Sequence, residues 1–86
     1  MTEKQFTEIA KKIITNYVLE HLDKSDETPT FDVYIVWLCK VLQNNKALLS
    51  TSLFDGMYYE ITYNGDKDEF YLDAYKKFEN RCITER

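Results

Sequence analysis

The chain has 86 residues, a length typical of one domain, and we expect residues 1–86 to fold as a single domain. Hydrophobic residues make up 44% of it and charged residues 30%, a globular composition that excludes a disordered chain. The net charge of −4 argues against a general nucleic-acid-binding protein, because such proteins usually carry a basic surface. No apolar run approaches the roughly 20 residues of a membrane-spanning helix, and the polar start lacks the apolar segment of a signal peptide. We therefore expect a cytoplasmic protein.

Residues 2–22 are predicted to form an amphipathic helix. Thr2 and Gln5 have the spacing of a capping box, which satisfies first-turn amides at a helix start. Apolar residues then recur at steps of three, one and four, which places them on one stripe: Phe6, Ile9, Ala10, Ile13, Ile14, Tyr17, Val18 and Leu22. A helix of this length spans roughly 30 Å, so we expect it to cross one face of a small sheet.

Residues 23–30 form a polar, acidic connector, in which Pro29 disfavours helix. Residues 33–42 follow, with apolar side chains at both parities, and a helical stripe is an alternative interpretation of them. We favour a strand because Val33, Ile35 and their neighbours are β-branched or aromatic. Two apolar faces predict a central strand that is covered on both sides.

Two further strands are predicted downstream. The asparagine-containing residues 43–46 form the expected turn, and residues 47–53 form the second strand. The Asp-Gly pair at 55–56 turns the chain again. Residues 57–63 alternate between apolar and polar side chains, which predicts a third strand with one buried and one wet face.

The Asn-Gly pair at 64–65 is the strongest hairpin signal in the chain. Residues 66–68 widen that loop, and residues 69–72 are predicted to return as a fourth strand. Asp73 is a suitable N-cap for a last helix that continues to about Cys82. The predicted fold is therefore α+β: an N-terminal helix packed on a four-stranded antiparallel meander, with a short C-terminal helix.

No residue pattern indicates catalysis or metal binding. Cys39, Cys82 and the single histidine, His21, cannot complete a four-ligand zinc site without carboxylates. We interpret the cysteines as small buried apolar residues, with a disulfide or a reactive thiol as alternatives. Residues 64–69 superficially resemble a calcium loop but are flanked by predicted strands, whereas an EF-hand loop joins two helices. Because catalytic and phosphate-binding motifs are also missing, we expect no cofactor, no metal and no enzymatic activity.

Exposed tyrosines near carboxylates are typical of protein-binding surfaces, where tyrosine is enriched. Tyr58 shares the wet parity of its strand with Glu60, and the loop that follows carries further acids. We therefore predict a surface that binds a protein partner, comprising Tyr34, Tyr58, Glu60, Asp66 and Asp68.

Nucleic acid is the alternative partner. It requires that basic residues from the net-positive segments 34–52 and 76–86 converge into one patch: Lys40, Lys46, Lys76, Lys77 and Arg81. Residues 53–75 disfavour this alternative, because they hold six carboxylates against one lysine. The exposed edges of a meander can also pair with a second copy, so a homodimer is a further alternative.

Several strings of residues resemble a known family. They include Leu-Gln-Asn-Asn-Lys-Ala-Leu at 42–48, Asp-Gly-Met-Tyr-Tyr-Glu at 55–60, Thr-Tyr-Asn-Gly-Asp at 62–66 and Leu-Asp-Ala-Tyr-Lys-Lys at 72–77. The family comprises short proteins of unknown function from phages and prophages of Gram-positive bacteria. The resemblance implies an accessory protein in the bacterial cytoplasm that binds a host or phage protein, for example to inhibit a host or defence factor. The alternative is a nucleic-acid-associated protein of the phage replication or transcription module. The resemblance implies no activity and no cofactor.

Overall fold

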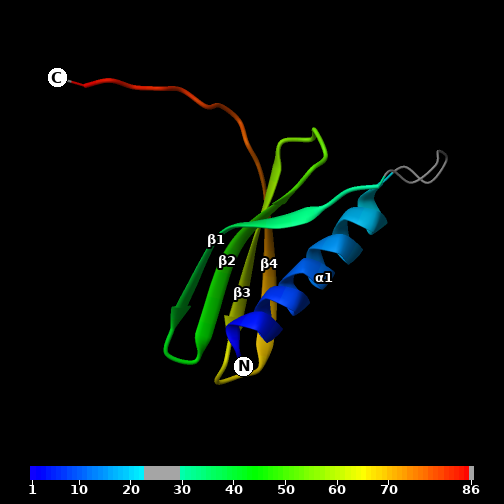
Figure 1. The fold of residues 1–86 in the computed structure, drawn as a ribbon, viewed down its shortest axis with the longest axis vertical. Helices are drawn as coiled ribbons and strands as arrows, with labels where there is room; N and C mark the ends of the chain where they lie inside the picture. The colour runs from blue at the N-terminus through cyan, green and yellow to red at the C-terminus, as the bar shows by residue number, and fades with distance from the viewer. Residues whose placement is uncertain (23–29, 86) are drawn as a thin grey trace.

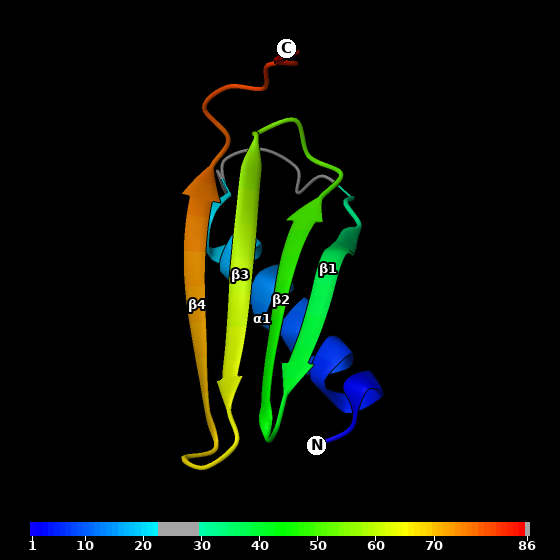
Figure 2. The same cartoon turned by 90° about the vertical axis from the view of Figure 1, so that its left-hand side faces the viewer.

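The computed structural model describes residues 1–22 and 30–85. In chain order the elements are α1 (Glu3–His21), β1 (Val33–Val41), β2 (Asn44–Thr51), β3 (Met57–Asn64) and β4 (Glu69–Lys76). The strands form an antiparallel sheet in the order β1-β2-β3-β4, and α1 lies on one face of it (Figures 1 and 2). The predicted helix on a four-stranded meander is therefore confirmed. The predicted acidic connector lies, except for Thr30, outside the described residues.

The capping box at the start of α1 is confirmed. Thr2 Oγ1 accepts a hydrogen bond from the Gln5 amide at 3.1 Å, and Gln5 Oε1 accepts one from the Thr2 amide at 2.9 Å. Four buried side chains then follow at intervals of four residues: Phe6, Ala10, Ile14 and Val18. They seat the helix on β1, β2 and β3, and burial of each large one contributes roughly 1.5–3 kcal/mol.

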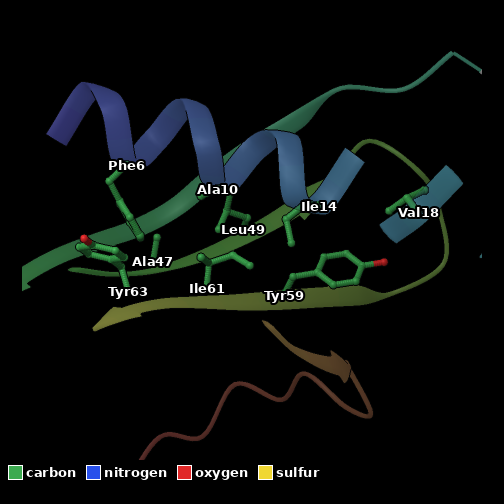
Figure 3. Close-up of a cluster of buried hydrophobic side chains, with 9 residues drawn as sticks. All are labelled: Phe6, Ala10, Ile14, Val18, Ala47, Leu49, Tyr59, Ile61 and Tyr63. Carbon is green, nitrogen blue, oxygen red and sulfur yellow. The ribbon is translucent and has the colours of Figure 1, made fainter. Parts of the chain in front are cut away.

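The core lies between α1 and the middle of the sheet. Figure 3 shows the helix side chains pointing onto buried residues of β2 and β3, which are Ala47, Leu49, Tyr59, Ile61 and Tyr63. Along each strand these residues occupy every second position, which is the alternation that was predicted for β3. Side chains between them point to the opposite face of the sheet. The sheet therefore has one face covered by α1 and one that α1 does not cover.

The first strand is confirmed, but its predicted central position is wrong, because β1 is an edge strand that pairs only with β2. The register shifts between Ile35 and Trp37, so Val36 is the extra residue of a β-bulge. A bulge changes which parity faces the core, and both Ile35 and Leu38 pack against it. Apolar residues at both parities thus reflect the bulge and not two covered faces.

The first turn also differs from the prediction, because it comprises Leu42 and Gln43 and β2 already begins at Asn44. Leu42 has a φ of 56° and supplies the left-handed conformation that was expected from an asparagine. The two asparagines serve the sheet instead. Asn44 Oδ1 accepts a hydrogen bond from the Gly65 amide at 3.0 Å, and Asn45 is buried on the covered face.

The other two turns fall where they were predicted. Gly56 has a φ of 69°, which favours glycine, and Asp55 Oδ1 accepts a hydrogen bond from the Met57 amide at 3.0 Å. The loop between β3 and β4 begins at Gly65 and ends at Asp68, whose φ is 51°.

The predicted C-terminal helix is wrong. Asp73, its expected N-cap, lies inside β4, and residues 77–85 form neither helix nor strand. The reason is the length of β3: β4 pairs with all eight of its residues, from Asn64 opposite Glu69 to Met57 opposite Lys76. Pairing with β4 along its whole length gives hydrogen-bond partners to backbone groups of β3 that would have none if residues 73–76 were helical. Figure 1 shows residues 77–85 leading away from the sheet.

Candidate functional site

The face of the sheet that points away from α1 is covered by no element among residues 1–22 and 30–85, and it faces the viewer in Figure 2. We call it the open face: the side chains of β1–β4 on the side opposite α1. Register and alternation place five aromatic residues on it, which are Tyr34, Trp37, Tyr58, Tyr71 and Tyr75. Three of the four strands contribute to this aromatic set.

The aromatic side chains lie in rows that cross the sheet. One row runs through Tyr34, Ser50, Tyr58 and Tyr75. The next row runs through Trp37, Leu48, Glu60 and Asp73. Directly opposite residues stand about 4.5–5.5 Å apart at their Cβ atoms, so neighbours in a row are in contact range. Aromatic side chains therefore occur across the width of the open face, with Ser50, Leu48 and two carboxylates between them, and we call this set the aromatic surface.

Much of this surface is in contact with water. Trp37 is 42% exposed, Tyr34 47% and Tyr75 52%. A shallow depression of about 380 Å³ is lined by Leu48, Tyr58 and Tyr75 and, at the end of β4, by Lys76 and Lys77. Large apolar side chains that stay exposed together mark interaction sites more often than single ones do.

The centre of the open face carries negative charge. Lys46 Nζ lies 3.2 Å from Glu60 Oε1, which balances that carboxylate. Asp73 stands directly opposite Glu60, and like charges in this position destabilise a sheet. Within the described part of the chain, Asp73 takes part in no ion pair. Among the described residues, Asp73 thus lies between Tyr71 and Tyr75 on the edge strand with no cation to balance it.

Three of the five residues predicted to bind a partner share the open face: Tyr34, Tyr58 and Glu60. The structure does not bring Asp66 and Asp68 to them, because both lie in the β3–β4 loop at the far end of β3 from Tyr58. The predicted surface therefore divides into an aromatic part on the sheet and an acidic part in a loop.

The carboxylates of the β3–β4 loop accept hydrogen bonds from residues of this chain. Asp66 Oδ1 accepts a hydrogen bond from Gln43 Nε2 at 2.8 Å, which ties the β3–β4 loop to the β1–β2 turn. Asp68 Oδ1 accepts one from the Tyr63 hydroxyl at 2.8 Å, and this bond raises the pKa of Tyr63. Both acids thus have structural partners within the chain.

The five basic residues of the alternative site do not converge. Lys40 lies within 3.4 Å of the Met1 carbonyl oxygen, and Lys46 pairs with Glu60, both toward the β1–β2 turn. Lys76 ends β4 at the opposite end of the sheet, roughly 17 Å along that strand from the row that contains Lys46. Lys77 and Arg81 follow Lys76 in the segment that leads away from the sheet.

The sequence did not indicate the contribution of β4 to the open face. Tyr71 was placed in a short fourth strand, whereas Asp73 and Tyr75 were assigned to the last helix, although all three alternate with the half-buried Phe70 and Leu72. That alternation is the signal that identifies them as one face of a strand. Trp37 was missed for a different reason: the bulge at Val36 changes the parity of the residues after it, so simple alternation does not place Trp37 on the open face.

The remaining candidate groups show no site. Cys39 and Cys82 are free and exposed, so their interpretation as buried residues is wrong. His21 Nδ1 is 2.8 Å from the Tyr17 carbonyl oxygen, and the two rings stack at 4.1 Å. Residues 1–22 and 30–85 contain no group of three or more potential metal ligands. In the same residues, no helix is long and apolar enough to span a membrane.

These features define a small α+β protein with a helix on one face of its sheet and an exposed aromatic surface on the other. The model of a family of unknown function, DUF6275, matches residues 7–85, so the chain belongs to this family. The match includes all four strands and the segment that follows β4. No curated protein and no solved structure matches the chain.

Proposed function

We propose that the protein is a non-enzymatic accessory protein that binds a host or phage protein through the open face. The observation that carries this proposal is the set of five aromatic side chains on a sheet face that α1 leaves uncovered. Tyrosine and tryptophan are enriched at protein interfaces because they bury large areas at low entropic cost. The phage or prophage origin, the Gram-positive host and the cytoplasmic location come from the family resemblance of the sequence.

The charge of the open face indicates what the partner presents. Asp73 lies in the aromatic surface opposite Glu60, and no cation of the described residues pairs with it. An arginine or lysine of the partner would balance this carboxylate and would stack on the neighbouring rings, a cation–π arrangement that favours arginine. We therefore expect the partner to insert a basic side chain, flanked by apolar ones, over the row of Leu48, Glu60 and Asp73.

The test is a tagged pull-down from bacterial lysate, with and without nuclease, followed by mass spectrometry. The wild type is compared with the double variant Tyr58→Ala, Glu60→Lys. This variant breaks the surface pair with Lys46, which contributes at most about 1 kcal/mol, so the fold should be retained. The matched control is Leu19→Ala, Glu20→Lys, which makes the same kind of change on the exposed side of α1.

The proposal is supported if one protein is retained by the wild type and by the α1 control even after nuclease treatment, and is lost from the open-face variant. Binding of that purified protein should then weaken at least roughly 100-fold in the open-face variant, as expected for loss of a central aromatic and a charge. Equal retention by both variants would overturn the proposed surface. Retention that nuclease abolishes would favour the nucleic-acid alternative, in which the same aromatic residues stack bases.

A further inference from the structure

The two edges of the sheet differ in their protection against pairing with another strand. The edge at β1 is interrupted by the bulge at Val36, and bulges are one way in which proteins protect an edge. The edge at β4 is regular over eight residues, and no strand among residues 1–22 and 30–85 pairs with it. The helix lies over β1, β2 and β3 and touches β4 where the Phe6 ring stacks on Phe70. On the covered side of the sheet, Phe70 and Leu72 are only half-buried and Ala74 is exposed. Figure 2 shows β4 at the margin of the sheet.

The backbone hydrogen bonds identify which residues of β4 face this edge. The Lys77 amide donates to the Gly56 carbonyl oxygen at 2.7 Å, next to the pair formed by Met57 and Lys76. Hydrogen-bonded and non-hydrogen-bonded pairs alternate along an antiparallel ladder. Odd-numbered residues of β4 therefore bond to β3, and even-numbered ones direct their amides and carbonyls away from it. The even-numbered residues inside the strand are Phe70, Leu72 and Ala74.

We infer that this edge pairs with the same edge of a second copy, as an antiparallel β4–β4 ladder in which Leu72 lies opposite Leu72. A two-fold axis must pass through a residue and not between two residues, because only then do side chains of the same face lie opposite one another. An axis at Asp73 places two aspartates opposite each other, and an axis at Tyr71 places Glu69 opposite Asp73. Both are disfavoured, because like charges in direct opposition destabilise a sheet.

The axis at Leu72 avoids these repulsions. It places Phe70 opposite Ala74, a large residue against a small one, and gives three hydrogen-bonded pairs that each exchange two bonds. In this register, Lys76 of each copy lies opposite Asp68 of the other copy, one such pair at each end of the ladder. The Asp68 carboxylate lies toward the covered side, since it accepts from buried Tyr63, and Lys76 shares that parity. The left-handed φ of Asp68 ends the ladder there.

Such a dimer extends the sheet to eight strands and joins the two open faces. Tyr71 and Tyr75 of each copy then lie near the middle of one larger aromatic surface. The inference depends on the β4 edge and not on the proposed partner, so either can fail without the other.

The first test measures the molar mass of the purified full chain by sedimentation equilibrium over a range of concentrations. We expect the mass of two chains for the wild type and for Ala74→Val, which keeps the amide. Ala74→Pro removes an amide that faces the free edge and not β3, which edge strands tolerate. It should raise the dimer dissociation constant roughly 30-fold or more, because two hydrogen bonds are lost per dimer. A wild type that stays monomeric, or an Ala74→Pro variant that is folded and dimeric, would overturn the inference.

The second test reads the register and does not depend on how well the proline variant folds. In a Cys39→Ser, Cys82→Ser background, Leu72→Cys places two thiols on the axis, with Cα atoms about 5.5 Å apart. This distance permits a disulfide, so mild oxidation should give a covalent dimer. Ala74→Cys in the same background separates the thiols by four positions, roughly 14 Å along the strand. Cross-linking through position 74 that equals or exceeds that through position 72 would refute the register.

Discussion

The two turns at one end of the sheet are held together around Gly65, and replacement of this glycine by alanine tests that contact. The Gly65 amide donates to Asn44 Oδ1 at 3.0 Å, and Gln43 Nε2 donates to Asp66 Oδ1 at 2.8 Å. A Cβ at Gly65 would lie 2.3 Å from the backbone carbonyl oxygen of Gln43 and 2.6 Å from its Cβ. Because a backbone atom cannot rotate away, the two turns must separate.

The size of the effect follows from these distances. A normal carbon–oxygen contact of about 3.4 Å requires a displacement of about 1 Å. This lengthens both hydrogen bonds beyond about 3.5 Å, where they no longer count as bonds. Their loss costs roughly 1 kcal/mol each, and residual strain adds roughly another 1 kcal/mol. We expect Gly65→Ala to lower the free energy of unfolding by about 3 kcal/mol and the midpoint of thermal unfolding by about 12–24 °C.

Urea and thermal unfolding followed by far-ultraviolet circular dichroism measure this loss. Gly56→Ala is the matched control: it places alanine at a φ of 69°, but its Cβ would meet nothing closer than the Lys77 carbonyl oxygen at 3.8 Å. The left-handed conformation alone costs about 1–2 kcal/mol. Asp66→Ala removes one hydrogen bond without a clash and should cost about 1 kcal/mol. A Gly65→Ala variant that is no less stable than Gly56→Ala would refute the steric argument.

Two other changes test the interior of the covered face. Asn45 is buried, and neither Nδ2 nor Oδ1 has a hydrogen-bond partner among the described residues. Asn45→Val should therefore raise the free energy of unfolding by about 1–2 kcal/mol in urea titrations, and a decrease would show that the amide is satisfied. The hydrogen bond to Asp68 raises the pKa of Tyr63, and burial raises that of Tyr59. The folded chain thus keeps protons that the unfolded chain loses near pH 10, so stability should fall as the pH rises above about 10. Tyr63→Phe should weaken this fall, and an unchanged pH profile would contradict the role of the bond.

Local signals in the sequence were sufficient for α1 and β3. The capping box at Thr2 and a periodic apolar stripe specify the helix, and strict alternation specifies β3. β4 was predicted only in part, because residues four apart share a face in a helix and in a strand alike. Tyr71 and Tyr75 therefore fit both, and pairing along the whole of β3 decides for the strand.

The same limit explains what was found of the open face. Tyr34, Tyr58 and Glu60 were predicted because their strands were correctly placed. The bulge at Val36 and the extension of β4 depend on contacts between distant segments, which no short window of sequence contains. Errors of local structure thus became errors about the surface, since parity decides which side chains are exposed.

The arrangement of β4 predicts that partner binding and dimer formation can be separated. The side chains of its odd-numbered residues lie on the open face, and their backbone groups bond to β3. The amide and carbonyl of Ala74, in contrast, point to the free edge. Tyr58→Ala, Glu60→Lys should therefore lose the partner but keep the mass of two chains.

Ala74→Pro should show the reverse, becoming monomeric while it binds one soluble partner molecule with an unchanged dissociation constant. Sedimentation equilibrium and titration calorimetry on the same preparations measure both properties. An Ala74→Pro variant that is folded but loses both properties would mean that the open face is complete only in the dimer. In that case the aromatic surface formed across the β4–β4 junction, and not the face of a single chain, would be the unit that binds.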